Sequence, residues 1–172
     1  MPERLRLSKD FFCLDVLDVA PRIIGKILVK RNGSLSSDYI ITEVEAYRGE
    51  EDAACHARFG ITARNSIMYK QGGLLYVYLI YGMHWMMNIV TGNEGVPQAL
   101  LIRGLKGFNG PGRITKELGI DESHNGEDIA TSDLIWIEDP GTVSEFIQRP
   151  RVGIDYSYEP WKSIPWRYIL SP

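Results

Sequence analysis

The pattern of apolar and polar positions along the chain predicts a protein built mainly from short β-strands. Several runs of apolar or alternating residues have the length and composition of strands. These runs cover residues 26–30, 39–47, 99–103, 134–138 and 166–170.

Two neighbouring runs that are rich in aromatic and branched residues predict a β-hairpin. The first run is Leu74 to Tyr81, and the second is His84 to Val90. We expect the turn at Tyr81-Gly82-Met83. A large side chain at the tip of a hairpin cannot pack against its own sheet, so Tyr81 should be exposed there.

Helical patterns occur in two segments. Ser8 precedes an amphipathic run, which predicts a capped helix that ends before Pro21. A second, shorter helix is expected at residues 113–118, entered through Gly110-Pro111-Gly112 and ended by Gly119.

The order of these elements indicates the fold class. Strands outnumber helices, and the crossover helices that a parallel α/β fold needs are missing from the pattern. The sequence has no internal repeat, low-complexity tract or linker-like stretch. We therefore predict an α+β fold, in which residues 1–172 form a single compact domain around a curved, mostly antiparallel β-sheet with a protruding β-hairpin.

The composition is that of an ordinary globular domain, since 44% of the 172 residues are hydrophobic and 24% are charged. No stretch approaches the roughly 18 apolar residues of a membrane span, so no membrane partner is expected. No apolar segment follows the charged N-terminus, which argues against a secretory signal. Cys13 and Cys55 fit a reducing cytosol, although a bridge between them stays open at this stage. We expect a cytoplasmic protein.

The net charge of −3 hides an uneven distribution of charge. Residues 53–116 contain seven Lys and Arg residues and one acid, Glu94. Residues 117–145 contain nine acids and neither Lys nor Arg. This split is compatible with one face that meets phosphate and another that avoids it, or simply with a solvated acidic loop.

The motifs of metal and nucleotide sites are missing. The three histidines, His56, His84 and His124, have none of the spacings of zinc ligands, so no metal is predicted. The Gly110-Pro111-Gly112 turn is not followed by the Lys-Ser/Thr pair of a phosphate loop, and we predict no cofactor.

Carboxylates are the first candidates for chemistry. Glu43, Glu45 and Tyr47 would share one face of the strand at residues 39–47. The opposite face would hold Ile40, Thr42, Val44 and Ala46. The two glutamates are either solvent-facing, or buried together so that each raises the pKa of the other and one acts as a base on water. The acids at residues 50–52 suggest solvated loop charge.

Aromatic residues are the second candidates. Tyr76, Tyr78 and Trp85 belong to the predicted hairpin, where most aromatic side chains simply form core. Tyr81 differs because of its place at the tip. An exposed aromatic side chain near basic residues suits stacking on a base or insertion into a duplex.

Together these segments resemble one known family, the alkyladenine (3-methyladenine) DNA glycosylases. The resemblance spans nearly the whole chain, and its motifs occur here in one order. They are Thr42-Glu43-Val44-Glu45-Ala46-Tyr47, Asp52-Ala53-Ala54-Cys55-His56, Thr62-Ala63-Arg64-Asn65, Leu75-Tyr76-Val77-Tyr78-Leu79-Ile80-Tyr81-Gly82-Met83, Met87-Asn88-Ile89, Leu101-Ile102-Arg103, Gly110-Pro111-Gly112-Arg113-Ile114 and Arg151-Val152-Gly153. The family's mixed fold around a curved antiparallel sheet agrees with the strand pattern.

The resemblance implies roles for the residues of an active site. Glu45 matches the general base that activates water, and Arg103 matches the arginine that positions Glu45 and this water. Tyr47, His56 and Tyr78 match the pocket that sandwiches and hydrogen-bonds a flipped base.

The resemblance also implies residues that select the base and contact DNA. Asn88 matches the residue that crowds the 2-amino group of guanine, and Leu101 belongs to the same base pocket. Tyr81 matches the hairpin-tip residue that fills the gap left by the flipped nucleotide, with Met83 beside it. The implied DNA-binding residues are Arg64, Asn65 and Arg113. His84 stands where some relatives carry Tyr, so it either contacts phosphate or fills space.

These matches predict a monofunctional glycosylase that flips alkylated purines, with deaminated purines as further candidates, and cuts the N-glycosidic bond with water. Its expected partner is double-stranded DNA that contains damaged purines. We expect a monomer, associated with the nucleoid if the source is bacterial. Two alternatives stay open, namely a module that binds distorted DNA without chemistry and a hydrolase for free nucleosides. Release of free base from duplex DNA, but not from nucleosides, would separate the three.

Overall fold

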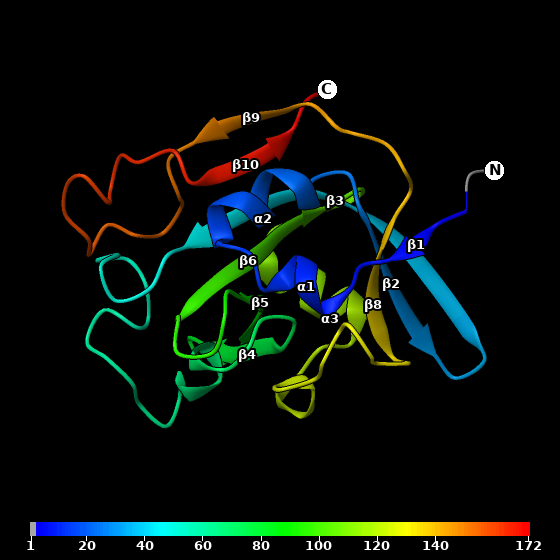
Figure 1. The fold of residues 1–172 in the computed structure, drawn as a ribbon, viewed down its shortest axis with the longest axis horizontal. Helices are drawn as coiled ribbons and strands as arrows, with labels where there is room; N and C mark the ends of the chain where they lie inside the picture. Colours follow the sequence, from blue (N-terminus) through cyan, green and yellow to red (C-terminus); the bar gives the residue numbers. More distant parts are fainter. Residues whose placement is uncertain (1–2) are drawn as a thin grey trace.

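Ten strands form a single sheet in the computed structural model, which describes residues 3–172 (Figure 1). The strands are β1 (Leu5–Arg6), β2 (Ile27–Asn32), β3 (Leu35–Tyr47), β4 (Leu75–Ile80), β5 (His84–Thr91), β6 (Gln98–Leu105), β7 (Phe108–Asn109), β8 (Ile135–Asp139), β9 (Phe146–Arg149) and β10 (Arg167–Leu170). The α-helices are α1 (Lys9–Phe12), α2 (Val16–Ile23) and α3 (Pro111–Leu118), and the 3-10 helices are η1 (Ser66–Tyr69) and η2 (Glu122–His124). All pairings between these strands are antiparallel, which confirms the predicted α+β fold.

The long strand β3 joins the two halves of the sheet, whose order is β1-β8-β2-β3-β6-β5-β4. Residues 35–40 of β3 pair with β2. Farther along the strand, Glu43, Val44 and Glu45 lie between β6 on one side and β10 on the other. Glu45 faces Leu101 of β6 and Arg167 of β10 in register. The candidate base, Glu45, therefore lies in a segment of β3 that is paired with a strand on both edges.

The faces predicted for β3 are wrong near residues 40–42, because a β-bulge lies there. The pairing of β3 with β6 shifts between Ile41 and Glu43, so the alternation of faces is interrupted there. Ile41 is fully buried, whereas Ile40 and Thr42, which were predicted to share a face with Val44 and Ala46, are only partly buried. Gly104 faces the bulge, and a Cβ atom at that position would lie 2.8 Å from the Cβ of Glu43. Only glycine lets β6 approach the bulge this closely.

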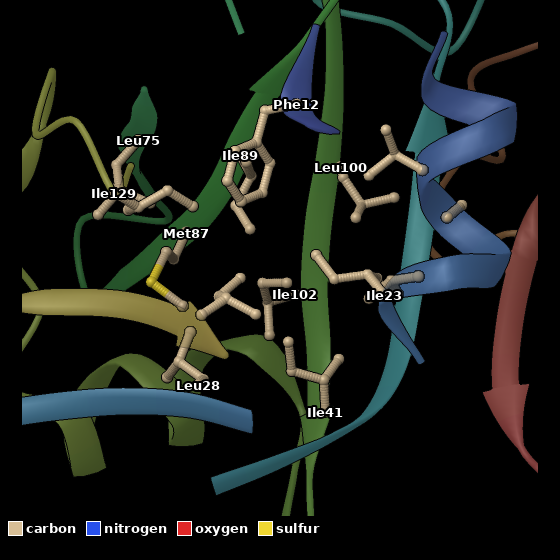
Figure 2. Packing of buried hydrophobic residues seen from close by; sticks show 14 of the residues in the cluster. Phe12, Ile23, Leu28, Ile41, Leu75, Met87, Ile89, Leu100, Ile102 and Ile129 are labelled. Carbon is tan, nitrogen blue, oxygen red and sulfur yellow. The ribbon is translucent and has the colours of Figure 1, made fainter. Parts of the chain in front are cut away.

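The main hydrophobic core fills the space between α2 and the sheet. Figure 2 shows Ile23 of α2 gathered with Ile41 of β3 and with Leu100 and Ile102 of β6. These four side chains are completely buried. Each such side chain contributes about 1.5–3 kcal/mol relative to an exposed one, so this layer holds β3 firmly in place.

The predicted N-terminal helix is wrong in its bounds, because two short helices replace it. Asp15 caps α2 by accepting a hydrogen bond from the backbone N–H of Leu17 at 2.9 Å, which starts a new helix there. Pro21 lies inside α2, although the pattern had placed it beyond the helix. A proline inside a helix costs about 3 kcal/mol. Burial of Val16, Val19, Ala20 and Ile23 on one face of α2 offsets this cost.

The predicted hairpin and the second helix are confirmed. Residues 81–83 connect β4 to β5, and α3 begins two residues earlier than predicted, with Pro111 at its first turn. Gly119 ends α3 in the left-handed conformation. The Thr115 hydroxyl of α3 donates to the carbonyl oxygen of Trp85 at 2.9 Å, so α3 supports the hairpin close to its turn.

The acidic stretch at residues 117–145 does not lie on one side of the molecule. Part of it covers the outer edge of β4, where the Leu75 N–H donates to the carbonyl of Glu127 and the Val77 N–H donates to the side chain of Asn125. Another part forms β8, which lies toward the opposite end of the sheet. The split along the sequence is therefore not a simple split between two faces. Within residues 3–172, no helix has the length and apolarity needed to cross a membrane.

Candidate active site

Glu45 is completely buried, so the alternative of a solvent-facing strand glutamate is wrong. Its Oε2 accepts a hydrogen bond from the Tyr47 hydroxyl at 2.8 Å. Its Oε1 accepts one from the backbone N–H of Val152 at 2.7 Å and lies 3.5 Å from Nε of Arg103. The carboxylate is thus fixed by a neighbour on its own strand, by β6 and by the loop that follows β9.

Burial raises the pKa of Glu45, and four groups oppose that shift. Arg103 and Arg151 act through their positive charge, while the Val152 N–H and the Tyr47 hydroxyl donate hydrogen bonds. The raised pKa does not come from Glu43, as the sequence had suggested. A buried carboxylate with a raised pKa and fixed orientation is suited to accept a proton.

Glu43 has a different environment, because two arginines hold it. Its Oε1 accepts hydrogen bonds from Arg103 at 3.2 Å and from Arg167 of β10 at 3.1 Å. Arg103 therefore lies between the two carboxylates and is closer to Glu43 than to Glu45. Glu43 orients the arginine that in turn faces Glu45.

A cleft of about 550 Å³ is lined by Tyr47, Arg103 and Val152, the three residues that contact the Glu45 carboxylate, whereas Glu45 itself is not part of the lining. Eight of the residues predicted to form the site line it, namely Tyr47, His56, Arg64, Tyr78, Tyr81, Asn88, Leu101 and Arg103. The neighbours of Arg151 along the chain, Val152 and Gly153, also line this cleft. A larger cleft of about 880 Å³ lies between the N-terminal segment and the loop after β8, and it contains none of the predicted residues.

His56, Tyr76 and Tyr78 form one aromatic wall of the cleft. The ring centroids of His56 and Tyr78 are 4.5 Å apart, and those of Tyr76 and Tyr78 are 5.0 Å apart. Rings in direct contact leave no room for a third ring. A purine could enter between His56 and Tyr78 only after one of these side chains had moved.

His56 is neutral at neutral pH, because burial and the nearby Arg64 and Arg58 lower its pKa to about 4. Its Nδ1 lies 2.9 Å from the Tyr76 hydroxyl. Burial raises the pKa of Tyr76 to about 12, so this hydroxyl keeps its proton. The pair is therefore uncharged over the physiological pH range.

Asn88 and Leu101 lie opposite each other on β5 and β6 and are 3% and 5% exposed. The Asn88 side-chain amide donates to the carbonyl of Tyr76 at 3.2 Å, which fixes its orientation. These two residues form a rigid part of the cleft wall.

Asp52 and Arg151 form a fully buried ion pair that the sequence analysis missed. The guanidinium of Arg151 donates to both carboxylate oxygens of Asp52, at 2.6 and 2.9 Å, and both side chains have no exposed surface. The interpretation of Asp52 as solvated loop charge is therefore wrong. The apolar run Ala53-Ala54-Cys55 directly after Asp52 was the available signal for burial.

The residues predicted to meet DNA differ in exposure. Tyr81 is 88% exposed and has a positive φ of 51°, which costs about 1–2 kcal/mol in a residue other than glycine. Met83 is 68% exposed, and Arg64 and Arg113 are also exposed. Strain at an exposed turn is typical of a functional position.

Asn65 departs from its predicted role as a DNA contact. It is 2% exposed, and its amide nitrogen donates to the carbonyls of His56 and Gly60, each at 3.0 Å. Its Oδ1 accepts from the Thr62 N–H at 2.7 Å. These three side-chain hydrogen bonds hold the loop that carries Arg64.

The two cysteines are both unbridged, which answers the question that the sequence left open. Cys55 is buried in the wall of the cleft, and burial raises the pKa of its thiol to about 11. The thiol therefore stays protonated at neutral pH and serves as packing.

Comparison with known proteins places this chain in one family. The sequence model of the methylpurine-DNA glycosylase (MPG) family matches residues 10–108 and 106–172. A protein of Anaeromyxobacter sp. (strain Fw109-5) is 41% identical, over 96% of this chain and 89% of its own length. Proteins of Legionella pneumophila (strain Corby) and Methanocella arvoryzae are 39% and 37% identical, over 96% and 94% of this chain and 94% and 90% of their own lengths. All three carry the name 3-methyladenine DNA glycosylase as a provisional assignment.

The chain belongs to the methylpurine-DNA glycosylase family. It is accordingly a hydrolase of the DNA glycosylase class, which acts on alkylated bases in DNA repair, and its substrate is DNA.

Proposed function

We propose that the protein turns a damaged purine out of duplex DNA into the 550 Å³ cleft and hydrolyses its N-glycosidic bond with a water molecule activated by Glu45. One observation carries this proposal. The Glu45 carboxylate is buried and held by Tyr47, Val152 and Arg103, which line the cleft. A fixed carboxylate with a raised pKa is suited to remove a proton from water.

In the proposed reaction, Glu45 takes a proton while the water oxygen forms a bond to C1′ of the sugar. The bond between C1′ and the purine nitrogen breaks, and its electron pair leaves with the base. A cationic alkylated purine becomes neutral as it leaves and needs no acid catalyst. Because the nucleophile is water rather than a lysine amine, no Schiff base forms, and the enzyme is monofunctional.

The aromatic residues supply the proposed base site. Tyr47, His56 and Tyr78 stack on the purine. A neutral His56 does not repel a cationic base. When Tyr76 donates to Nδ1, the Nε2–H of His56 is left as a donor for an acceptor on the base, such as the carbonyl of a deaminated purine. Deaminated purines are therefore included as proposed substrates.

Selection and flipping are assigned to residues at the wall and rim of the cleft. Asn88 crowds the 2-amino group of guanine and so disfavours normal guanine. Flipping costs a few kcal/mol, and Tyr81 offsets part of this cost by filling the gap in the duplex, with Met83 beside it. Arg64 and Arg113 are exposed and contact phosphates. The monomeric state stays a prediction.

The test compares Glu45→Gln with its matched control, Glu43→Gln. We expect Glu45→Gln to bind lesion duplex normally but to release base about 10²–10⁴-fold more slowly. Glu43→Gln should cost far less, because Glu43 only orients Arg103. The assay is single-turnover release of free base from a duplex oligonucleotide and, in parallel, from the free nucleoside. Normal turnover by Glu45→Gln would refute the assignment of the base, and equal release from nucleoside would indicate a nucleoside hydrolase.

A further inference from the structure

The buried Asp52–Arg151 pair contacts β3 at the two residues that directly follow Glu45. One Nη1 hydrogen of Arg151 goes to the carbonyl of Ala46 at 2.9 Å, between Glu45 and Tyr47 in the strand. The guanidinium carbon lies 4.8 Å from the ring centre of Tyr47. The residue after Arg151, Val152, is the one whose N–H binds Glu45.

The loop that carries Arg151 is anchored on both sides of this contact. The Nε of Arg167 donates to the carbonyl of Pro150 at 2.8 Å, directly before Arg151. On the other side, Nη2 of Arg151 donates to the carbonyl of Trp161 at 3.3 Å, and Trp166 lies 5.2 Å from the guanidinium carbon. The hydrogen bonds of Arg151 thus connect the loop after β9 to β3.

Stability alone gives a poor reason for this buried pair. A buried ion pair contributes little to stability compared with well-packed apolar residues of the same volume. The Nε of Arg151 is also buried without a hydrogen-bond partner among the described residues, which adds a further cost. A guanidinium at this position is better explained by what it holds in place.

We propose that Asp52 and Arg151 are positioning residues for the reaction, which fix the Val152 N–H on Glu45 and keep the Glu45 carboxylate oriented and ionised. This inference rests on the proposed role of Glu45 as the base. Arg151 acts through its backbone neighbour and through its charge, and it touches neither substrate nor water itself. The carboxylate of Asp52 holds the guanidinium of Arg151. It also accepts hydrogen bonds from the backbone N–H groups of Arg48 and Ala54, each at 3.0 Å.

The charge of Arg151 has a measurable consequence. The groups that face Glu45 are Tyr47 on β3, Arg103 on β6, and Arg151 with the Val152 N–H on the loop, while Arg167 of β10 is turned to Glu43 and Pro150. Of these, Arg103 and Arg151 lower the pKa of Glu45 by their charge. Loss of Arg151 should therefore move the acid limb of the pH–rate profile to higher pH.

The main test is the double variant Asp52→Asn/Arg151→Met, in which both charges of the buried pair are removed together. Replacing both partners avoids the uncompensated buried charge that a single substitution leaves, so the double variant should fold. We expect lesion-duplex binding close to wild type, a lower rate on the plateau because the Val152 N–H is no longer fixed, and an acid limb at higher pH. The matched control is Lys26→Met/Asp139→Asn, which removes a 2.6 Å ion pair that lines the other cleft, and it should leave the profile unchanged.

Arg151→Lys keeps the positive charge but loses the bidentate hydrogen bonds of the guanidinium. It therefore separates the effect of the charge on Glu45 from the positioning of the Val152 N–H. It should keep the wild-type acid limb while lowering the rate on the plateau, because a single ammonium cannot hold Asp52 and Ala46 together. If the folded double variant has the wild-type profile, or loses binding in step with rate, the pair is only structural and the proposal is overturned. If the double variant does not fold, a wild-type plateau rate in Arg151→Lys overturns it. Failure of the proposed function would appear separately, as normal turnover by Glu45→Gln.

Discussion

The low pKa of His56 predicts a specific dependence of stability on pH. The folded protein holds His56 neutral down to about pH 4, while the ordinary value is 6.5. Between these values the unfolded chain binds a proton that the folded protein does not bind, so the free energy of unfolding falls as the pH falls. The complete effect is about 3 kcal/mol, and the linkage relation gives a loss of about 2 kcal/mol between pH 7 and pH 5. That is a large share of the roughly 5–15 kcal/mol that stabilises a typical domain.

The assay is urea unfolding of the wild type and of His56→Gln at both pH values. Other groups titrate in the same window, and Glu45 acts in the opposite direction because its pKa is raised. The informative quantity is therefore the fall in the free energy of unfolding between pH 7 and pH 5, compared between the two proteins. This fall should be about 2 kcal/mol smaller in His56→Gln than in the wild type. His84→Gln, at an exposed histidine of the hairpin, is the control for the replacement of histidine by glutamine. Equal pH dependence in wild type and His56→Gln would refute the reasoning.

Three further predictions concern DNA. Tyr81→Ala should lower excision of well-paired lesions by about 5- to 150-fold, from roughly 1–3 kcal/mol of lost stacking, and of mispaired lesions by less; equal losses on both substrates would indicate a folding defect. Asn88→Ser should raise release of normal guanine while damaged adenine is still excised, and unchanged guanine release would remove Asn88 from discrimination. Arg64→Gln should reduce the slope of log affinity against log salt by about one, whereas an unchanged slope would show that Arg64 makes no phosphate contact.

The strand pattern was readable from the sequence because period-two alternation and turn residues act locally. The hairpin was predicted with its turn, and Tyr81 is exposed as expected. The missed strands β1, β7 and β9 are only two to four residues long, and their existence depends on a partner far along the chain. β9 forms against β10, and nothing in its own residues, which include Gln148 and Arg149, indicates a strand.

The candidate site was predicted where side chains of distinct chemistry occur in motifs, and it was missed where burial decides the role. Glu45 and Arg103 lie in contact as expected. Asp52 was taken for a surface charge because its partner, Arg151, lies 99 residues away. Asn65 was assigned to DNA because it follows Arg64 in a motif that resembles the family's, yet its amide donates to two carbonyls of its own loop. Charged and amide side chains carry little local signal of whether they are inside or outside.

The central place of β3 also bears on how the molecule opens. Its residues 43–45 are paired on both edges, and the strand links the two halves of the sheet, so its amides should exchange with solvent only through global unfolding. The turn at Tyr81 has no such restraint and should open at little cost in free energy. The proposed base therefore belongs to the most persistent segment of the fold, and the residue proposed to probe the duplex belongs to one of the least persistent.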